Sequence, residues 1–204
     1  FVDDQVGKIL DALEQSPFAD NTIIVFTSDH GYHMGEKDNL AKQTVWEEST
    51  RVPLVVVAPG LTRAGQECPL PVSHIDLYPT LADLCGLPGD ANAGGNKLAL
   101  DGHSLRPLLR KPRGGKSNGP RVALTSRAGA GKLAPNEPGK VEDQHYTVRS
   151  RRWRYVLCSD GSEELYDHRL DPQEWTNLAR TDTYDAIKGN LRRQLLRMTG
   201  RATG

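Results

Sequence analysis

An acidic residue and a histidine stand side by side directly after an apolar stretch of this sequence. Asp29 and His30 follow residues 22–28, and Lys42 comes 13 residues after Asp29. A carboxylate oxygen suits a hard cation such as Ca²⁺ or Mg²⁺, and a neutral imidazole can add a ligand or a hydrogen bond. The lysine ammonium is a point charge suited to a sulfate or phosphate oxygen. The pattern predicts a cation site beside an anion contact, although Asp-His-Gly triplets also serve simply to turn a chain.

The segments around this triplet are expected to alternate between helix and strand. Helical spacing of apolar residues predicts a helix at residues 2–15, and Pro and Gly at the ends predict one at residues 74–88; a short helix is also expected at residues 41–50. Continuous apolar runs predict buried strands of a mostly parallel sheet at residues 22–28 and 52–60. In such α/β sheets ligands bind beyond the carboxyl ends of the strands, which is where Asp29 and His30 lie.

The character of the chain changes at a Gly- and Pro-rich stretch, residues 111–120. We therefore expect an α/β domain over residues 1–110 and a small α+β subdomain over residues 111–204. The subdomain is predicted to be an antiparallel sheet closed by a helix at residues 182–200. Its four short strands are expected at residues 121–126, 145–150, 153–159 and 163–168.

Charge is divided unevenly between these two parts. Residues 1–110 carry 8 Lys and Arg against 15 Asp and Glu, whereas residues 111–204 carry 18 against 11. The excess positive charge either helps the halves dock or offers arginines to an anionic substrate. No nucleic-acid-binding motif accompanies it, and no apolar stretch approaches the roughly 20 residues of a membrane span. We therefore expect neither nucleic acid nor a membrane as a partner.

Several motifs in the same order resemble those of a type I sulfatase of the alkaline phosphatase superfamily. The similarity is strongest to the iduronate-sulfatase and choline-sulfatase-like branches. It runs through residues 3–60, 74–88 and 100–109, and it resumes over residues 153–179. The resemblance implies the C-terminal portion of an enzyme that hydrolyses the sulfate ester of a small molecule or glycan with a divalent cation. It also implies a periplasmic or secreted protein.

The resemblance assigns roles to individual residues. Asp29 and His30 would hold the cation, usually Ca²⁺ with Mg²⁺ as a possibility, and Lys42 would be the catalytic contact to the sulfate and the leaving-group oxygen. Glu47 is expected to form an ion pair with Arg51 beneath this loop. Many relatives have a histidine where this chain has a lysine at position 37. Further candidates for contacting the substrate are His33, Lys37, His74 and His145.

Part of a sulfatase active site is absent from these residues. The family nucleophile is a formylglycine made from Cys or Ser in a C/S-x-P/A-x-R segment, and Cys68, Cys85 and Cys158 all lack that pattern. The N-terminal metal ligands of the family are absent too. We therefore expect this chain alone to be inactive and to need the N-terminal half of the same protein, or self-association, to cover its apolar sheet edge. The alternatives are a phosphodiesterase or phosphonate hydrolase of the same superfamily and a non-catalytic binding module.

Overall fold

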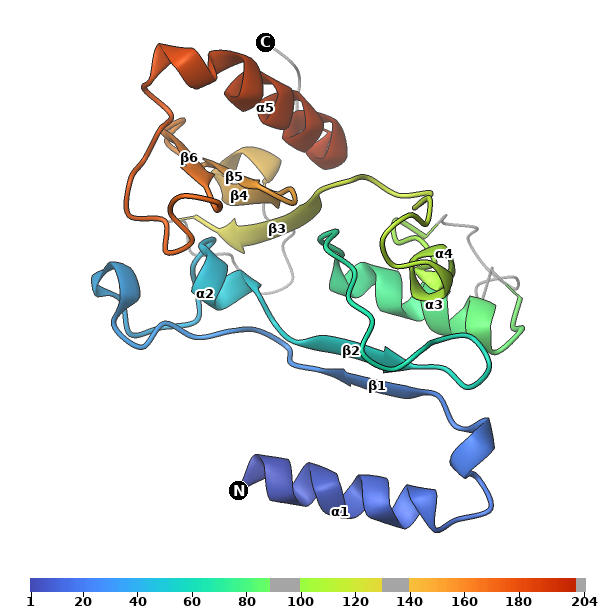
Figure 1. The fold of residues 1–204 in the computed structure, drawn as a ribbon. Coiled ribbons are helices and arrows are strands. Elements are labelled where there is room, and N and C mark those ends of the chain that lie inside the picture. The colour runs from blue at the N-terminus through green and yellow to red at the C-terminus, as the bar shows by residue number, and fades with distance from the viewer. Residues whose placement is uncertain (89–99, 130–139, 201–204) are drawn as a thin grey trace.

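The computed structural model describes residues 1–88, 100–129 and 140–200 (Figure 1). The described residues form two sheets with helices around them. None of the helices among these residues is long and apolar enough to cross a membrane. The helices are α1 (Val2–Glu14), α2 (Glu47–Thr50), α3 (Leu77–Leu84), α4 (Arg106–Arg110) and α5 (Asp185–Thr199), and the strands are β1 (Ile24–Thr27), β2 (Leu54–Val57), β3 (Ala123–Ala128), β4 (Gln144–Arg149), β5 (Trp153–Leu157) and β6 (Glu163–Asp167).

The first sheet consists of β1 and β2. The two strands run antiparallel, with Ile24 opposite Val57 and Thr27 opposite Leu54. Both strands were predicted, but for a mostly parallel sheet, and the direction of this pair differs from that expectation. A parallel pair needs a crossover, usually through a helix packed on the sheet. The connection here, residues 28–53, contains only short helical turns, a 3-10 turn at Glu36–Asp38 and the single-turn helix α2, and it brings the chain back along β1.

Apolar side chains remain exposed on this sheet and on the helix that precedes it. Phe26, Val55 and Val57 are 42%, 52% and 43% exposed, and α1 has no buried residue. Figure 1 shows α1 lying apart from the second sheet, below β1. The apolar runs were correctly read as strand and helix. Nothing among the described residues supplies the second layer that would bury them.

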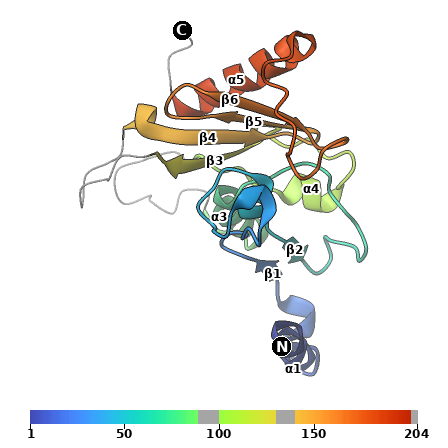
Figure 2. The same ribbon diagram turned by 90° about the vertical axis from the view of Figure 1, so that its left-hand side faces the viewer.

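The second sheet is a four-stranded antiparallel meander in the order β3, β4, β5, β6, as predicted. Helix α5 covers one face (Figure 2) and buries Leu191, Leu195 and Leu196 against the sheet. The hairpin between β5 and β6 turns at Gly161, whose φ of +84° is in the left-handed region that favours glycine. The α/β class and the small sheet with its closing helix are therefore confirmed.

Candidate active site

The loop after β1 holds the carboxylate and the imidazole close together. Asp29 Oδ2 lies 3.2 Å from His30 Nε2. His30 Nδ1 lies 2.7 Å from the Gly31 carbonyl oxygen, so we place the ring proton on Nδ1. Nε2 then faces the carboxylate, where a cation or a proton can lie between the two groups. An imidazole whose other nitrogen donates to a backbone carbonyl is the usual arrangement of a metal-binding histidine. Asp29 and His30 therefore fit a divalent cation as two of its ligands.

Gly31 fixes this loop against α2. Its N–H donates to the Ser49 carbonyl oxygen at 2.9 Å. A Cβ at position 31 would lie 1.9 Å from the carbonyl oxygen of Glu48, which is far inside van der Waals contact. Only glycine allows the two backbones to approach this closely. The position of Asp29 and His30 relative to α2 thus follows directly from the residue type at position 31.

Asp29, His30 and Lys42 line one pocket of about 490 Å³. Residues 42–44 form one part of its wall, and Ser49 and Thr50 of α2 continue it. His74, whose Nε2 lies 3.4 Å from Thr27 Oγ1, also reaches the pocket. The structure therefore brings together the three residues predicted to act on cation and sulfate, together with one of the additional candidates.

The second half of the chain closes the pocket. Residues 125–129, at the end of the edge strand β3, form the remaining wall. Arg127 is among them, and its side chain makes no hydrogen bond or ion pair that involves another described residue. Sequence reasoning did not single out this arginine. The one available signal was the positive charge of residues 111–204.

The charges in the pocket act on one another. Loss of solvent contact works to raise the pKa of the Asp29 carboxyl, but the charge of His30, backbone hydrogen bonds and the charge of Lys42 hold this pKa below its ordinary value. Asp29 is thus an anion at neutral pH. A cation at Asp29 and His30, with the Lys42 ammonium nearby, would give the pocket two attractive points for an anionic ligand.

Two predicted substrate contacts lie outside this pocket and have structural partners. His33 is fully buried, with Nε2 2.8 Å from Thr44 Oγ1 and Nδ1 3.2 Å from the Glu36 carbonyl oxygen. The Lys37 ammonium lies 4.8 Å from the Trp46 ring centroid and donates to the Tyr166 hydroxyl at 3.2 Å. It also donates to the carbonyl oxygen of Glu174. Lys37 thus ties its loop to the second sheet.

His145 is the third candidate outside the pocket. It lies on β4 opposite Arg127, and its Nδ1 accepts a hydrogen bond from the Ser159 N–H at 3.4 Å. It does not line the pocket that holds Lys42. Contact of His33, Lys37 or His145 with a substrate stays a prediction.

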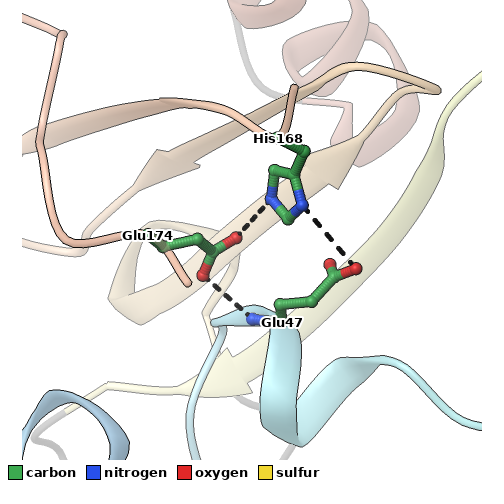
Figure 3. A group of neighbouring side chains, drawn as sticks. All are labelled: Glu47, His168 and Glu174. Carbon is green, nitrogen blue, oxygen red and sulfur yellow. Dashed lines mark hydrogen bonds and ion pairs between the residues drawn. The ribbon is translucent and has the colours of Figure 1, made fainter. Parts of the chain in front are cut away.

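A buried ionic cluster joins α2 to the second sheet (Figure 3). His168 Nε2 lies 2.8 Å from Glu174 Oε1, and His168 Nδ1 lies 3.8 Å from Glu47 Oε1. The Glu47 backbone N–H donates to Glu174 Oε2 at 3.0 Å. The two carboxylates and the imidazole are close enough to share a metal ion. Arg154, however, donates to both carboxylates, and Arg149 donates to Glu47. Because arginines already neutralise the glutamates, this cluster fits a structural joint better than a metal site.

The partner of Glu47 differs from the prediction. Glu47 pairs with Arg154 and Arg149 of the second sheet, not with Arg51, whose backbone N–H caps α2. The reason lies in the tertiary structure. The side chain of Glu47 is directed into the interface between α2 and the sheet, where Arg149 of β4 and Arg154 of β5 donate to it and His168 lies nearby. Residues distant in sequence therefore decided the pairing.

Lowering the pH from 5 to 2 is expected to remove about 3 kcal/mol of stability through Glu47. Burial raises its pKa, but Arg154 and Arg149 outweigh burial and hold the pKa at about 2, against an ordinary 4.5. A carboxyl whose pKa is lower in the folded protein than in the unfolded chain stabilises the fold fully above its unfolded-state pKa. That contribution is lost as the pH falls through the folded-state pKa, at about 1.4 kcal/mol per pKa unit of the shift.

Urea unfolding of the wild type and Glu47→Gln at both pH values measures this effect. The variant should be the less stable protein at pH 5, and the difference should nearly vanish at pH 2. A difference that stays constant between the two pH values would show that Glu47 is not the titrating group.

Comparison with known proteins finds similarity to sulfatases. Residues 1–87 match the family model described as Sulfatase. The chain is 38% identical over 179 residues to a sulfatase of Formosa agariphila, and 34% identical over 179 residues to the choline-sulfatase of Rhizobium meliloti. Each alignment covers 88% of this chain.

The match to the sulfatase family model thus covers the first part of the chain. The alignments to the sulfatase relatives continue beyond this segment into the second half of the chain. The chain spans about 30% of the length of these relatives.

Solved structures show the same fold. One protein structure is described as a complex with its substrate, D-glucosamine-2-N,6-O-disulfate. It aligns with 98% of this chain, with a TM-score of 0.78 and 26% identity. The phosphonate monoester hydrolase of Agrobacterium radiobacter matches 98% of the chain with a TM-score of 0.79 and 31% identity. This chain covers 39% of each of those two chains. The fold is therefore shared by sulfatases and phosphonate hydrolases, and the family model and the curated relatives favour the sulfatase.

Proposed function

We propose that this chain supplies two cation ligands, Asp29 and His30, and the sulfate-binding lysine, Lys42, to the active site of an enzyme that hydrolyses sulfate esters. The observation that carries the proposal is the pocket that unites Asp29, His30 and Lys42. The sequence separates Lys42 from the other two, and the docking of the Gly31 loop on α2 brings them to one cavity. Sulfatase relatives over 88% of the chain support the reaction type.

Each of these residues has a distinct task in that reaction. Asp29 and His30 would hold the divalent cation, for which Ca²⁺ is proposed from the family, and the cation would draw negative charge from the sulfate oxygens. Lys42 lines the same pocket, and its side chain makes no ion pair with a described residue. There it can orient the sulfate and stabilise charge that develops on the leaving oxygen.

The nucleophile must come from residues outside this chain. Cys68 and Cys85 are exposed and Cys158 is partly buried, and none of the three lines the pocket. The formylglycine that the family uses would have to enter the pocket from a segment carrying the C/S-x-P/A-x-R pattern. The exposed apolar surface of α1 and β1–β2 is where such a segment's domain could pack.

The pocket favours a sugar as the body of the substrate. Five of its lining residues carry hydroxyl groups: Thr44, Ser49, Thr50, Thr125 and Ser126. No aromatic ring of Phe, Tyr or Trp lines it among the described residues. Thr44 and Thr50 already hydrogen-bond within the chain, but the hydroxyls of Thr125 and Ser126 can exchange hydrogen bonds with a polyhydroxylated ring. The sulfated-sugar ligand of one structural neighbour agrees with this proposal.

Calcium dependence tests the proposal. A hybrid in which this chain replaces the matching stretch of the Formosa agariphila sulfatase should release sulfate in Ca²⁺ and lose that activity in EDTA. Asp29→Asn removes a ligand charge, so the Ca²⁺ concentration for half-maximal activity should rise by at least the roughly 10–100-fold that outer-shell partners cost.

Asp20→Asn is the matched control, because Asp20 is exposed and lies outside the pocket. It should leave the Ca²⁺ requirement unchanged. A folded hybrid whose sulfate release is indifferent to both EDTA and Asp29→Asn would contradict the proposal.

A further inference from the structure

The loop that carries Lys42 folds around one buried imidazole. His33 is fully buried, and its backbone N–H donates to the Ala41 carbonyl oxygen at 3.0 Å. Its ring Nε2 lies 2.8 Å from Thr44 Oγ1. Ala41 immediately precedes Lys42, and Thr44 follows it by two residues. A single residue therefore holds the chain on both sides of the lysine that the proposed sulfate contact uses.

The partners of the His33 ring fix its tautomer. The Glu36 carbonyl oxygen, 3.2 Å from Nδ1, can only accept, so the neutral ring carries its proton on Nδ1. Nε2 then accepts from the Thr44 hydroxyl, whose oxygen accepts in turn from the Trp46 backbone N–H at 3.4 Å. Each of these polar side-chain atoms has a partner, so Thr44 is held in one orientation at the pocket wall.

The surroundings of His33 are themselves anchored to the second sheet. The His33 and Trp46 rings meet edge to face, with their centroids 6.0 Å apart. Trp46 Nε1 donates to Glu164 Oε2 of β6 at 2.7 Å. The Lys37 ammonium lies 4.8 Å from the centroid of the same Trp46 ring and donates to the Glu174 carbonyl oxygen. The far side of the Lys42 loop is thus fixed by the second half of the chain.

Backbone strain is concentrated in this joint. Among the described residues, the non-glycine positions with positive φ are Lys37 and Asp38, both at +54°, and Glu174 at +62°. Such conformations are unfavourable for residues with a Cβ and persist only where the surrounding structure imposes them. Lys37 and Glu174 are hydrogen-bonded to each other. The contacts that hold the loop of Lys42 therefore also hold its strained backbone.

We propose that His33 is a positioning residue for Lys42. The inference rests on the proposed sulfatase function and adds how that chain places its lysine. The Lys42 side chain is exposed and makes no ion pair with a described residue, so its placement depends on its backbone. His33 does not line the pocket and acts only through the loop. Small displacements of a catalytic group are costly to the rate.

A double-mutant cycle in the hybrid with the Formosa agariphila sulfatase tests this role. His33→Phe keeps an aromatic ring beside Trp46 but removes both side-chain hydrogen bonds. We expect it to lower kcat/KM for sulfate release about tenfold when Lys42 is present, because two residues that act as one unit are strongly coupled. In the Lys42→Ala background the same substitution should change kcat/KM by less than about twofold.

Two further substitutions at position 33 separate the hydrogen bond from the packing. The amide oxygen of His33→Gln can reach the Thr44 hydroxyl and should restore part of the rate, whereas the side chain of His33→Asn is too short and should not. His33→Asn takes the place of His33→Phe in the cycle if the phenylalanine variant does not fold.

Leu196→Ala is the control for a general loss of stability. Leu196 is buried under α5 and lies outside the pocket of Lys42. This variant should lower the unfolding temperature, since it leaves a cavity in the core, yet keep kcat/KM within about twofold below that temperature.

The possible failures are distinguishable. If Lys42→Ala leaves the rate unchanged, the proposed function is wrong and the inference falls with it. If Lys42→Ala lowers the rate but the substitutions at His33 lower it equally in both backgrounds, or in neither, the proposed function stands and the positioning role is wrong. A loss that requires Lys42 and is partly restored by glutamine supports the inference.

Discussion

Replacing Arg154 with methionine is expected to lower the free energy of unfolding by about 3–5 kcal/mol. Arg154 is 1% exposed and donates to the carboxylates of Glu47 and Glu174, which are themselves buried. It also donates to the Val45 carbonyl oxygen at 3.0 Å and to Thr147 Oγ1 at 3.0 Å. Methionine fills a similar volume but leaves these acceptors without their donor. Two buried negative charges would then depend on Arg149 and His168 alone.

Urea unfolding at neutral pH measures this loss. Arg151→Met is the control, because Arg151 is exposed in the turn before β5 and makes no ion pair with a described residue. It should change stability by less than about 0.5 kcal/mol. Equal effects of the two substitutions would mean that the buried cluster does not hold α2 on the sheet.

The same cluster positions the pocket. Glu47 begins α2, and Ser49 and Thr50 of that single turn form part of the pocket wall. Arg154 also donates to Thr50 Oγ1 at 2.9 Å. A helix of one turn has little stability of its own. Its place beside Asp29 and His30 therefore depends on ion pairs from β4 and β5, which links the second half of the chain to the candidate active site.

Local sequence patterns predicted the elements well, because each depends on nearby residues. The spacing of apolar residues located α1, and a closing helix was expected where α5 lies. The direction of β2 relative to β1 was not predictable from its apolar run. Such a run indicates burial on both faces, but strand direction depends on the path of residues 28–53.

The residues of the candidate site also fall into those that the sequence predicted and those that it did not. Asp29, His30 and Lys42 follow from a motif and its resemblance to a family, and they line one pocket. Arg127 could not be chosen among 18 Lys and Arg residues of the second half without knowing that the end of β3 reaches that pocket. Lys37 is the opposite case, a residue that the motif singled out and that lies outside the pocket. Its place in the motif indicated a substrate contact, whereas the structure surrounds it with Trp46 and Tyr166 from distant segments.

Lys42→Ala is expected to reduce kcat/KM for sulfate release by about 10²–10³-fold in the hybrid described above, the effect of removing one preorganised donor from developing negative charge. Lys42 lines the pocket with its side chain free of ion pairs to described residues, so its removal breaks no structural contact there. The loss should therefore appear in catalysis while the unfolding temperature stays near that of the wild type. Initial rates of sulfate release at saturating Ca²⁺ give the comparison.

Lys116→Ala is the matched control, because Lys116 is exposed and lies outside the pocket. It removes the same charge and should leave kcat/KM within about twofold, since distant surface charges are screened by salt. Lys42→Arg keeps the charge but replaces a compact ammonium with a larger planar group, and it should recover only part of the rate. If Lys42→Ala and Lys116→Ala reduce the rate alike, Lys42 acts only through the general field of the protein. A loss confined to Lys42→Ala, partly restored by arginine, would place its ammonium against the reacting sulfate.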